Sequence, residues 1–108
     1  MITNDLLQLL DAEVAEFSSR ASGEQGYEYI NKIAARYVTS ERQKLVAALT
    51  SWLQLRSEPK TMIAVDIASN LHLNELRPEI EKLLVDVEQG NAFLPFYARP
   101  IKAALAMI

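Results

Sequence analysis

The sequence predicts an all-α fold of about six helices, which follow one another as antiparallel hairpins. Apolar residues recur at spacings of three and four along most of the 108 residues, and no convincing stretch follows the two-residue period of a strand. The three glycines and four prolines lie at or near the ends of the periodic segments, and Pro78 falls early enough in its helix to be tolerated. The links are short, which is typical of helices that pack antiparallel to their neighbours.

The first predicted helix fills residues 1–20. It begins near Thr3 and Asn4, which are good capping residues. Its apolar side chains form one stripe, consisting of Leu6, Leu9, Leu10, Val14 and Phe17. Its other side is polar and carries Asp5, Asp11, Glu13 and Glu16. A polar outer side of this kind suits a helix that caps the N-terminal end of a helical array.

Residues 25–56 are predicted to form the first hairpin unit. Its first helix, from about Gln25 to Val38, aligns Tyr27, Ile30, Ile33, Ala34 and Tyr37. Its second helix opens at Ser40, whose hydroxyl can cap the first turn, with Gln43 where a capping box requires it. That helix runs to about Arg56, and its core stripe contains Leu45, Val46, Leu49, Trp52 and Leu53.

Residues 59–89 are predicted to form the second unit. Pro59 fits the first turn of a helix, where its missing N–H has no partner to lose. The apolar stripe of this helix contains Ile63, Ile67 and Leu71. After a short link in which Asn74 is the expected cap, the next helix carries Leu76, Ile80, Leu83, Leu84 and Val87. Gly90 and Asn91 are expected to end it.

Residues 93–108 are predicted to form a truncated last unit. Pro95 and Pro100 predict an irregular start and a short helix. This helix presents Ile101, Leu105 and Ile108, and its last three residues are Ala-Met-Ile. We therefore expect this apolar C-terminal end to be an interface, covered by a partner or by a second copy in a homodimer.

The helices also show signs of a repeat. Sliding the chain by 34 residues keeps two successive helices in phase, pairing Ile33 with Ile67, Val46 with Ile80, Leu49 with Leu83 and Leu53 with Val87. Within residues 61–87, the run from Leu76 to Leu84 reads Leu-Arg-Pro-Glu-Ile-Glu-Lys-Leu-Leu. This stretch resembles one repeat of the HEAT family, whose second helix reads L-x-P-x-L-x-x-L-L, and Asp66 stands where such repeats often carry an aspartate. The resemblance implies a short stacked α/α array over about residues 25–108.

In size and style, the chain is also similar to small bacterial immunity-type proteins, which neutralise a cognate toxin. That similarity implies a protein partner and no chemistry. It assigns no functional residue, because a HEAT-type pattern specifies packing.

Charge and composition exclude several classes of function. The net charge of −3 divides into −4 over residues 1–19, +3 over 20–60, −4 over 61–90 and +2 over 91–108. No segment forms the dense basic stripe of a nucleic-acid-binding protein. The longest run without a charge, between Lys44 and Arg56, is too short to span a membrane. No cysteine is present and the N-terminal stretch is acidic rather than signal-like, so a cytoplasmic protein is expected.

His72 is the one histidine and the main candidate for chemistry. It could act as an acid, a base or a metal ligand, with Asp66 and Glu75 as the nearest acidic residues in sequence. Its position in a predicted turn favours a structural role, and no cysteine is present to complete a metal site. No phosphate-binding loop or hydrolase motif accompanies it. No cofactor, metal or catalytic residue is therefore predicted.

The remaining candidates are surface residues. The acidic residues Glu75, Glu79, Glu81, Asp86 and Glu88 could suggest a metal site or an acid–base pair, but the di-iron helical pattern needs two histidines. A solvated acidic face is favoured. If this face has a function, it would be an electrostatic patch that binds a basic protein. Tyr29 falls outside the apolar stripe of its helix and is a candidate interface anchor. Asp66 is likewise a candidate for a contact with a protein partner.

Together these patterns predict a non-catalytic protein-binding module, such as an immunity or adaptor protein. Two alternatives stay open at this level. One is a small helical enzyme or metal-binding protein that uses His72 and nearby carboxylates. The other is a self-associating structural domain.

Overall fold

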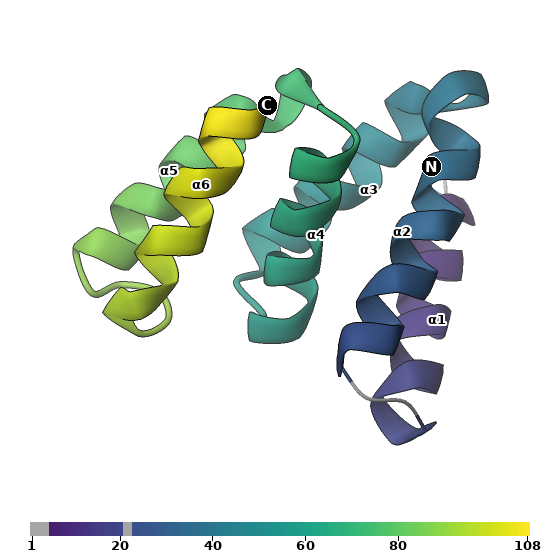
Figure 1. The fold of residues 1–108 in the computed structure, drawn as a ribbon, viewed down its shortest axis with the longest axis horizontal. Coiled ribbons are helices and arrows are strands. Elements are labelled where there is room, and N and C mark those ends of the chain that lie inside the picture. The colour runs from purple at the N-terminus through teal and green to yellow at the C-terminus, as the bar shows by residue number, and fades with distance from the viewer. Residues whose placement is uncertain (1–4, 21–22) are drawn as a thin grey trace. The chain divides into compact units, whose positions relative to one another are not determined.

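The computed structural model describes residues 5–20 and 23–108, and these residues form six α-helices and two short 3₁₀ helices without a strand (Figure 1). The helices are α1 (Asp5–Arg20), α2 (Gly23–Ser40), α3 (Arg42–Leu55), α4 (Glu58–Asn70), α5 (Arg77–Glu88) and α6 (Ala98–Met107). The 3₁₀ helices are η1 (Asn74–Leu76) and η2 (Pro95–Tyr97). The predictions of an all-α fold and of six helices are confirmed. Thr3 and Asn4, the predicted first caps, lie outside the described residues.

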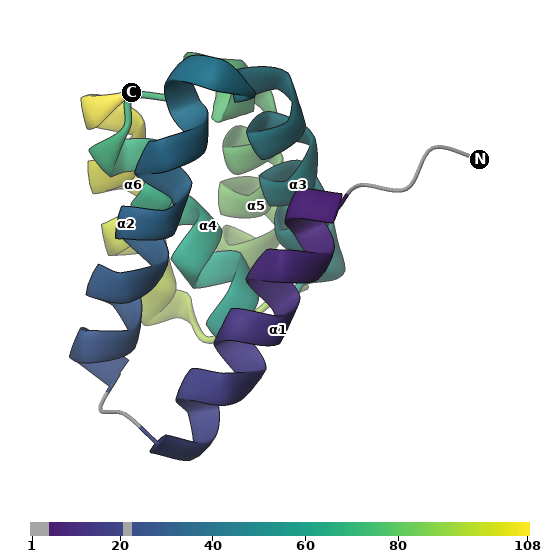
Figure 2. The same cartoon turned by 90° about the vertical axis from the view of Figure 1, so that its right-hand side faces the viewer.

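The chain divides into two compact units, Met1–Ala48 and Leu49–Ile108, and the division falls inside α3. In the first unit, α1 and α2 lie side by side (Figure 2). The buried residues of these helices include Leu6, Leu10 and Val14 of α1 and Ile30, Ile33 and Ala34 of α2. Leu9, predicted in the same stripe, is 37% exposed because the buried side follows the spacing of four that joins Leu6, Leu10 and Val14.

The junction of α2 and α3 differs from the prediction. Ser40 does not cap α3 but is the last residue of α2, and its hydroxyl donates back to the Arg36 carbonyl at 3.5 Å. Helical hydrogen bonding continues across the joint, because the Glu41 N–H donates to the Tyr37 carbonyl and the Leu45 N–H to the Glu41 carbonyl, at 2.8 and 3.1 Å. No glycine or proline stands here to stop α2 earlier. The predicted capping box at Ser40 is therefore wrong.

In the second unit, α6 packs against both α4 and α5 (Figure 1). The core of this unit contains side chains with at most 1% exposure, namely Trp52, Leu53, Ile67, Leu73, Leu76, Ile80, Leu83 and Ile101. Thr61 is the one polar residue that is buried among the residues described, and its hydroxyl donates to the Trp52 carbonyl at 2.7 Å. This bond ties the first turn of α4 to α3. Pro59 stands in that first turn, as predicted.

The C-terminal ends of α4 and α5 share one backbone motif. After α5, Gly90 has φ +78°, its N–H donates to the Val87 carbonyl at 3.2 Å, and the Asn91 N–H donates to the Asp86 carbonyl at 2.8 Å. After α4, His72 has φ +52° and stands where Gly90 stands in the other helix. This pair of crossed bonds around a left-handed residue is a Schellman motif. The predicted end at Gly90 is confirmed, whereas the left-handed backbone of His72 was not predicted.

Asn74 does not cap the following helix. It opens η1, and no side chain caps either η1 or α5 with a hydrogen bond. The start of α6 is irregular, as its prolines predict, because Pro95 opens η2 before the α-helix begins at Ala98. None of the helices that the structure describes is long and apolar enough to cross a membrane.

Candidate protein-binding surface

Large apolar side chains that remain exposed mark the candidate surface. In the described part of the chain these are Leu9, Tyr29, Leu55, Val85, Leu94, Phe96 and Met107. The two most exposed are Phe96 at 64% and Leu94 at 60%. Both belong to the connection between α5 and α6, residues 91–97, which we call the α5–α6 loop. Exposed apolar residues close together in sequence are a more informative feature than single ones.

The α5–α6 loop is held in shape at both ends. The Schellman motif fixes its start, and Ala92 is buried with 9% exposure. Phe93 then takes a left-handed backbone with φ +54°, which reverses the chain. The Tyr97 N–H donates to the Leu94 carbonyl at 3.0 Å and closes the 3₁₀ turn. The loop therefore presents Leu94 and Phe96 from a backbone with defined hydrogen bonds.

An aromatic cluster supports Phe96. The rings of Phe96 and Tyr97 are stacked, with centroids 4.5 Å apart and an interplanar angle of 26°. The Tyr97 ring also contacts Phe93, with centroids 5.5 Å apart at 50°. Phe93 and Tyr97 are half-buried, so they connect the exposed ring to the rest of the unit. Offset and tilted ring pairs at these distances are favourable, and they limit the rotamers that Phe96 adopts.

The helix that follows the loop presents a basic outer side. Ile101 and Ala104 of α6 are buried, whereas Arg99, Lys102 and Met107 are exposed. Residues 91–108 contain two basic residues and no acidic one. The Lys102 ammonium lies 3.4 Å from the Glu88 carboxylate, which forms an exposed ion pair between α6 and α5. The loop and α6 thus combine apolar groups with positive charge.

Two side chains bind the C-terminal end of α6. His72 Nδ1 lies 2.7 Å from the main-chain oxygen of Met107. Because that oxygen can only accept, the contact requires a proton on Nδ1. Arg77 Nη2 donates to the main-chain oxygens of Leu105 and Ile108 at 2.9 and 3.2 Å. Histidine and arginine are favourable partners for the oxygens that a helix leaves unbonded at its C-terminus.

This contact gives His72, the main candidate for chemistry in the sequence, a structural role. The side chain of His72 uses one of its two ring nitrogens to hold the end of α6. In the described part of the chain, no group of three or more histidine, aspartate or glutamate residues could hold a metal ion. Two residues of the acidic set, Glu79 and Asp86, also have partners within this unit.

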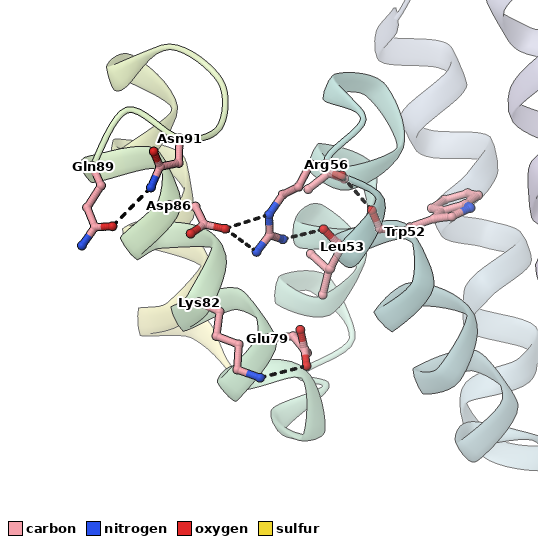
Figure 3. A network of polar contacts seen from close by, with 9 residues as sticks. Trp52, Leu53, Arg56, Glu79, Lys82, Asp86, Gln89 and Asn91 are labelled. Carbon is pink, nitrogen blue, oxygen red and sulfur yellow. Dashed lines mark hydrogen bonds and ion pairs between the residues drawn. The ribbon is translucent and has the colours of Figure 1, made fainter.

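Two of the predicted acidic residues form ion pairs inside the second unit (Figure 3). Asp86 Oδ2 accepts from Nε and Nη2 of Arg56 at 3.1 and 2.8 Å, while Nη1 of the same guanidinium donates to the Leu53 carbonyl. This joins the end of α3 to the end of α5. Glu79 pairs with Lys82 one turn further along α5, at 3.6 Å. The positive partners reduce the negative charge that this side offers to a basic protein.

The other predicted surface residues are dispersed. Glu75 of η1 and Glu81 of α5 are exposed, and Asp66 of α4 is half-buried and accepts from the Asn70 amide at 3.4 Å. Tyr29 is 42% exposed on α2, in the other unit.

The residues predicted for an apolar C-terminal interface are buried to different degrees. Ile101 is fully buried, and Leu105 and Ile108 are half-buried, because α6 turns this side toward α4 and α5. The exposed apolar residue of this end is Met107, at 57%. Leu94 and Phe96 were missed by the sequence analysis. The signal for them was the run Leu94-Pro95-Phe96, two large apolar residues around a proline outside any helical stripe.

Comparisons of the chain with protein-family models, curated proteins and solved structures gave no match. The function of the chain is therefore inferred from its own geometry.

Proposed function

We propose that this chain is a non-catalytic protein-binding module that holds a partner protein through the α5–α6 loop. The observation that carries the proposal is the exposure of Phe96 and Leu94, at 64% and 60%, on a backbone fixed by hydrogen bonds and ring contacts. Aromatic residues that enter a pocket of a partner dominate the energy of many interfaces. A supported ring loses little conformational freedom on binding, so more of its burial energy contributes to affinity.

The expected contribution of the loop is large for so short a segment. Burying a side chain of this size contributes about 1.5–3 kcal/mol relative to leaving it exposed. Two adjacent anchors can therefore support a specific complex when polar contacts surround them. Arg99 and Lys102 are exposed next to the loop in sequence and would supply such contacts to an acidic rim.

An adaptor or an immunity protein is the form of this function that we propose. Both hold a partner in an inert complex and need no catalytic group. A short HEAT-like array is the proposed architecture, and the cytoplasm is the proposed location. The partner of an immunity protein would be a toxin, in which case the complex would abolish the activity of that toxin.

Site-specific photo-crosslinking tests the proposal. A benzophenone side chain is introduced at position 96, and in a matched control at Glu81, which is also exposed but lies on α5. After irradiation in the native host, the position 96 protein should give one discrete adduct, and the position 81 protein should give none of comparable yield. Equal labelling from both positions, or no adduct from position 96, would show that the loop is not a binding surface.

A substitution pair then measures the anchor. Once the partner is identified, Phe96→Ser should weaken binding by about 2 kcal/mol, roughly 30-fold in Kd. Val85→Ser removes an exposed apolar side chain of α5 and should leave Kd within a factor of about two. Equal losses in the two variants would contradict the assignment of the loop as the anchor.

A further inference from the structure

The outer side of η2 and α6 forms one continuous helical stripe. Tyr97 and Ala98 have φ, ψ of −69°, −18° and −59°, −36°, so the 3₁₀ turn leads into the α-helix without a break. Exposed residues then recur at spacings of three, four and three, and we call them the α6 seam: Phe96, Arg99, Ala103 and Ala106. This is the spacing by which one helix packs along another. The buried residues Ile101 and Ala104 occupy the opposite side.

The α6 seam combines a large apolar group, a positive charge and two small residues. Phe96 stands at its start, and Met107 is exposed beside its end. Arg99 is exposed and has no hydrogen-bond or ion-pair partner among the residues described. Ala103 and Ala106 have short side chains, so a second helix can approach closely. An occupant that matches this seam is a helix with apolar and small residues on one side and negative charge beside them.

Helix α1 of the same sequence has these properties. It contains four acidic residues and one basic residue, a net charge of −3. Its exposed side includes Leu9 and the small residues Ala12 and Ala15. Glu13 is half-buried one turn after Leu9, much as Arg99 follows Phe96 in the seam. The two helices therefore have opposite charge and a similar alternation of large and small residues.

We infer that the α6 seam binds α1 of a second copy of this chain, so that copies associate head to tail. This inference rests on the proposed function, because it names the partner that Phe96 contacts. A symmetric pair of two α6 helices fits less well, because residues 91–108 contain no acidic group to pair with Arg99. A head-to-tail contact uses two different surfaces, so it forms an open series of copies unless the rotation between copies closes a ring. A single helix pair is a small interface, and a dissociation constant on the order of 10⁻⁴ M is expected.

Sedimentation velocity on the full chain tests the inference. The wild-type protein has a monomer mass of 12.1 kDa, and its average mass should rise steadily between roughly 10 μM and 1 mM, a range that brackets the expected constant. One variant, Phe96→Ser with Arg99→Glu, disables the α6 seam. A second, Leu9→Ser with Glu13→Lys, disables α1. Val85→Ser is the control and should associate as the wild type does.

The decisive sample is the mixture of the two disabled variants. Each variant alone should remain a monomer, whereas an equimolar mixture should form a one-to-one dimer and nothing larger, because each component retains one intact half. Circular dichroism of each variant shows first that its helices are retained. A monomeric wild type, or a mixture of the two variants that stays monomeric, would each overturn the inference.

The crosslinking experiment and the sedimentation of the wild type together separate this inference from the proposed function. If the crosslinked adduct of position 96 contains a different protein and the wild type is monomeric, the loop is a binding surface and the self-association is wrong. If position 96 gives no adduct with any protein, the proposed function itself is wrong. An adduct between two copies that joins position 96 to residues of α1 supports both.

Discussion

The ends of α4 and α5 use the same Schellman motif, but one is built around histidine and the other around glycine. Gly90 has φ +78° and, with no Cβ, adopts this backbone without steric cost. His72 adopts φ +52° with a full side chain, which costs about 1–2 kcal/mol for residues other than glycine. The chain therefore accepts strain at one helix end and avoids it at the other.

The contacts around the two residues explain the difference. A Cβ added at Gly90 would meet no atom within 4 Å, so nothing nearby requires a side chain there. The His72 ring contacts the Met107 oxygen at 2.7 Å, and so connects the α4 end to α6 across 35 positions of sequence. A hydrogen bond of this kind contributes about 1 kcal/mol, which offsets much of the backbone cost. The comparison indicates that His72 is present for its side chain and Gly90 for its backbone.

His72→Val should cause the largest loss of stability, because it affects both the ring contact and the left-handed backbone at this position. Valine loses the ring contact and, as a β-branched residue, fits the left-handed region poorly. We expect a loss of about 2 kcal/mol in the free energy of unfolding. Trp52 is the only tryptophan and is buried in this unit, so its fluorescence during urea unfolding provides the measurement.

His72→Asn is the matched control for that change. Asparagine also loses the ring contact but tolerates the left-handed region, so its loss should be about 1 kcal/mol. If the two variants unfold at the same urea concentration, backbone strain plays no part at this position, and the comparison with Gly90 fails.

Gly90→Ala should give an intermediate effect. The surroundings are open, so the cost comes from the backbone alone, and a smaller entropy of the unfolded chain offsets part of it. We expect a net loss of about 1 kcal/mol in the free energy of unfolding, measured in the same way. Gln89→Ala, at the preceding residue with φ −85°, is the control and should change stability by less than about 0.5 kcal/mol. An unchanged Gly90→Ala protein would mean that the end of α5 rearranges freely.

The starts and ends of helices at proline and glycine could be predicted, because they depend on residue type alone. Pro59 begins a helix since its ring fixes φ and it has no N–H to leave unbonded. Gly90 ends a helix because glycine has no Cβ and adopts a positive φ without steric cost. The helical spacing of the apolar residues likewise identified six helices and placed Trp52 in the core.

What could not be predicted depends on residues far apart in sequence or on competing local options. Ser40 can cap the next helix or bond back to Arg36, and both choices satisfy its hydroxyl. The reason for a histidine at position 72 becomes visible only when Met107 is next to it. Ile101 and Phe96 are both large and apolar, and only the packing of α6 on α4 and α5 shows that the first is core and the second is surface.

His72→Gly should give the smallest change in stability and so provides the finest test of the comparison. Glycine relieves the left-handed strain but loses the ring contact and adds freedom to the unfolded chain. These terms nearly cancel, so the free energy of unfolding should stay within about 0.5 kcal/mol of the wild-type value. The end of α6, however, would lose the His72 contact and keep those of Arg77 with Leu105 and Ile108. Hydrogen exchange of the Ile108 amide, which bonds to the Ala104 carbonyl at 3.2 Å, should therefore become faster, while exchange of the Leu83 amide in the buried part of α5 should not. Unchanged exchange at Ile108 would show that Arg77 alone holds α6, and that the side chain of His72 does not explain its strained backbone.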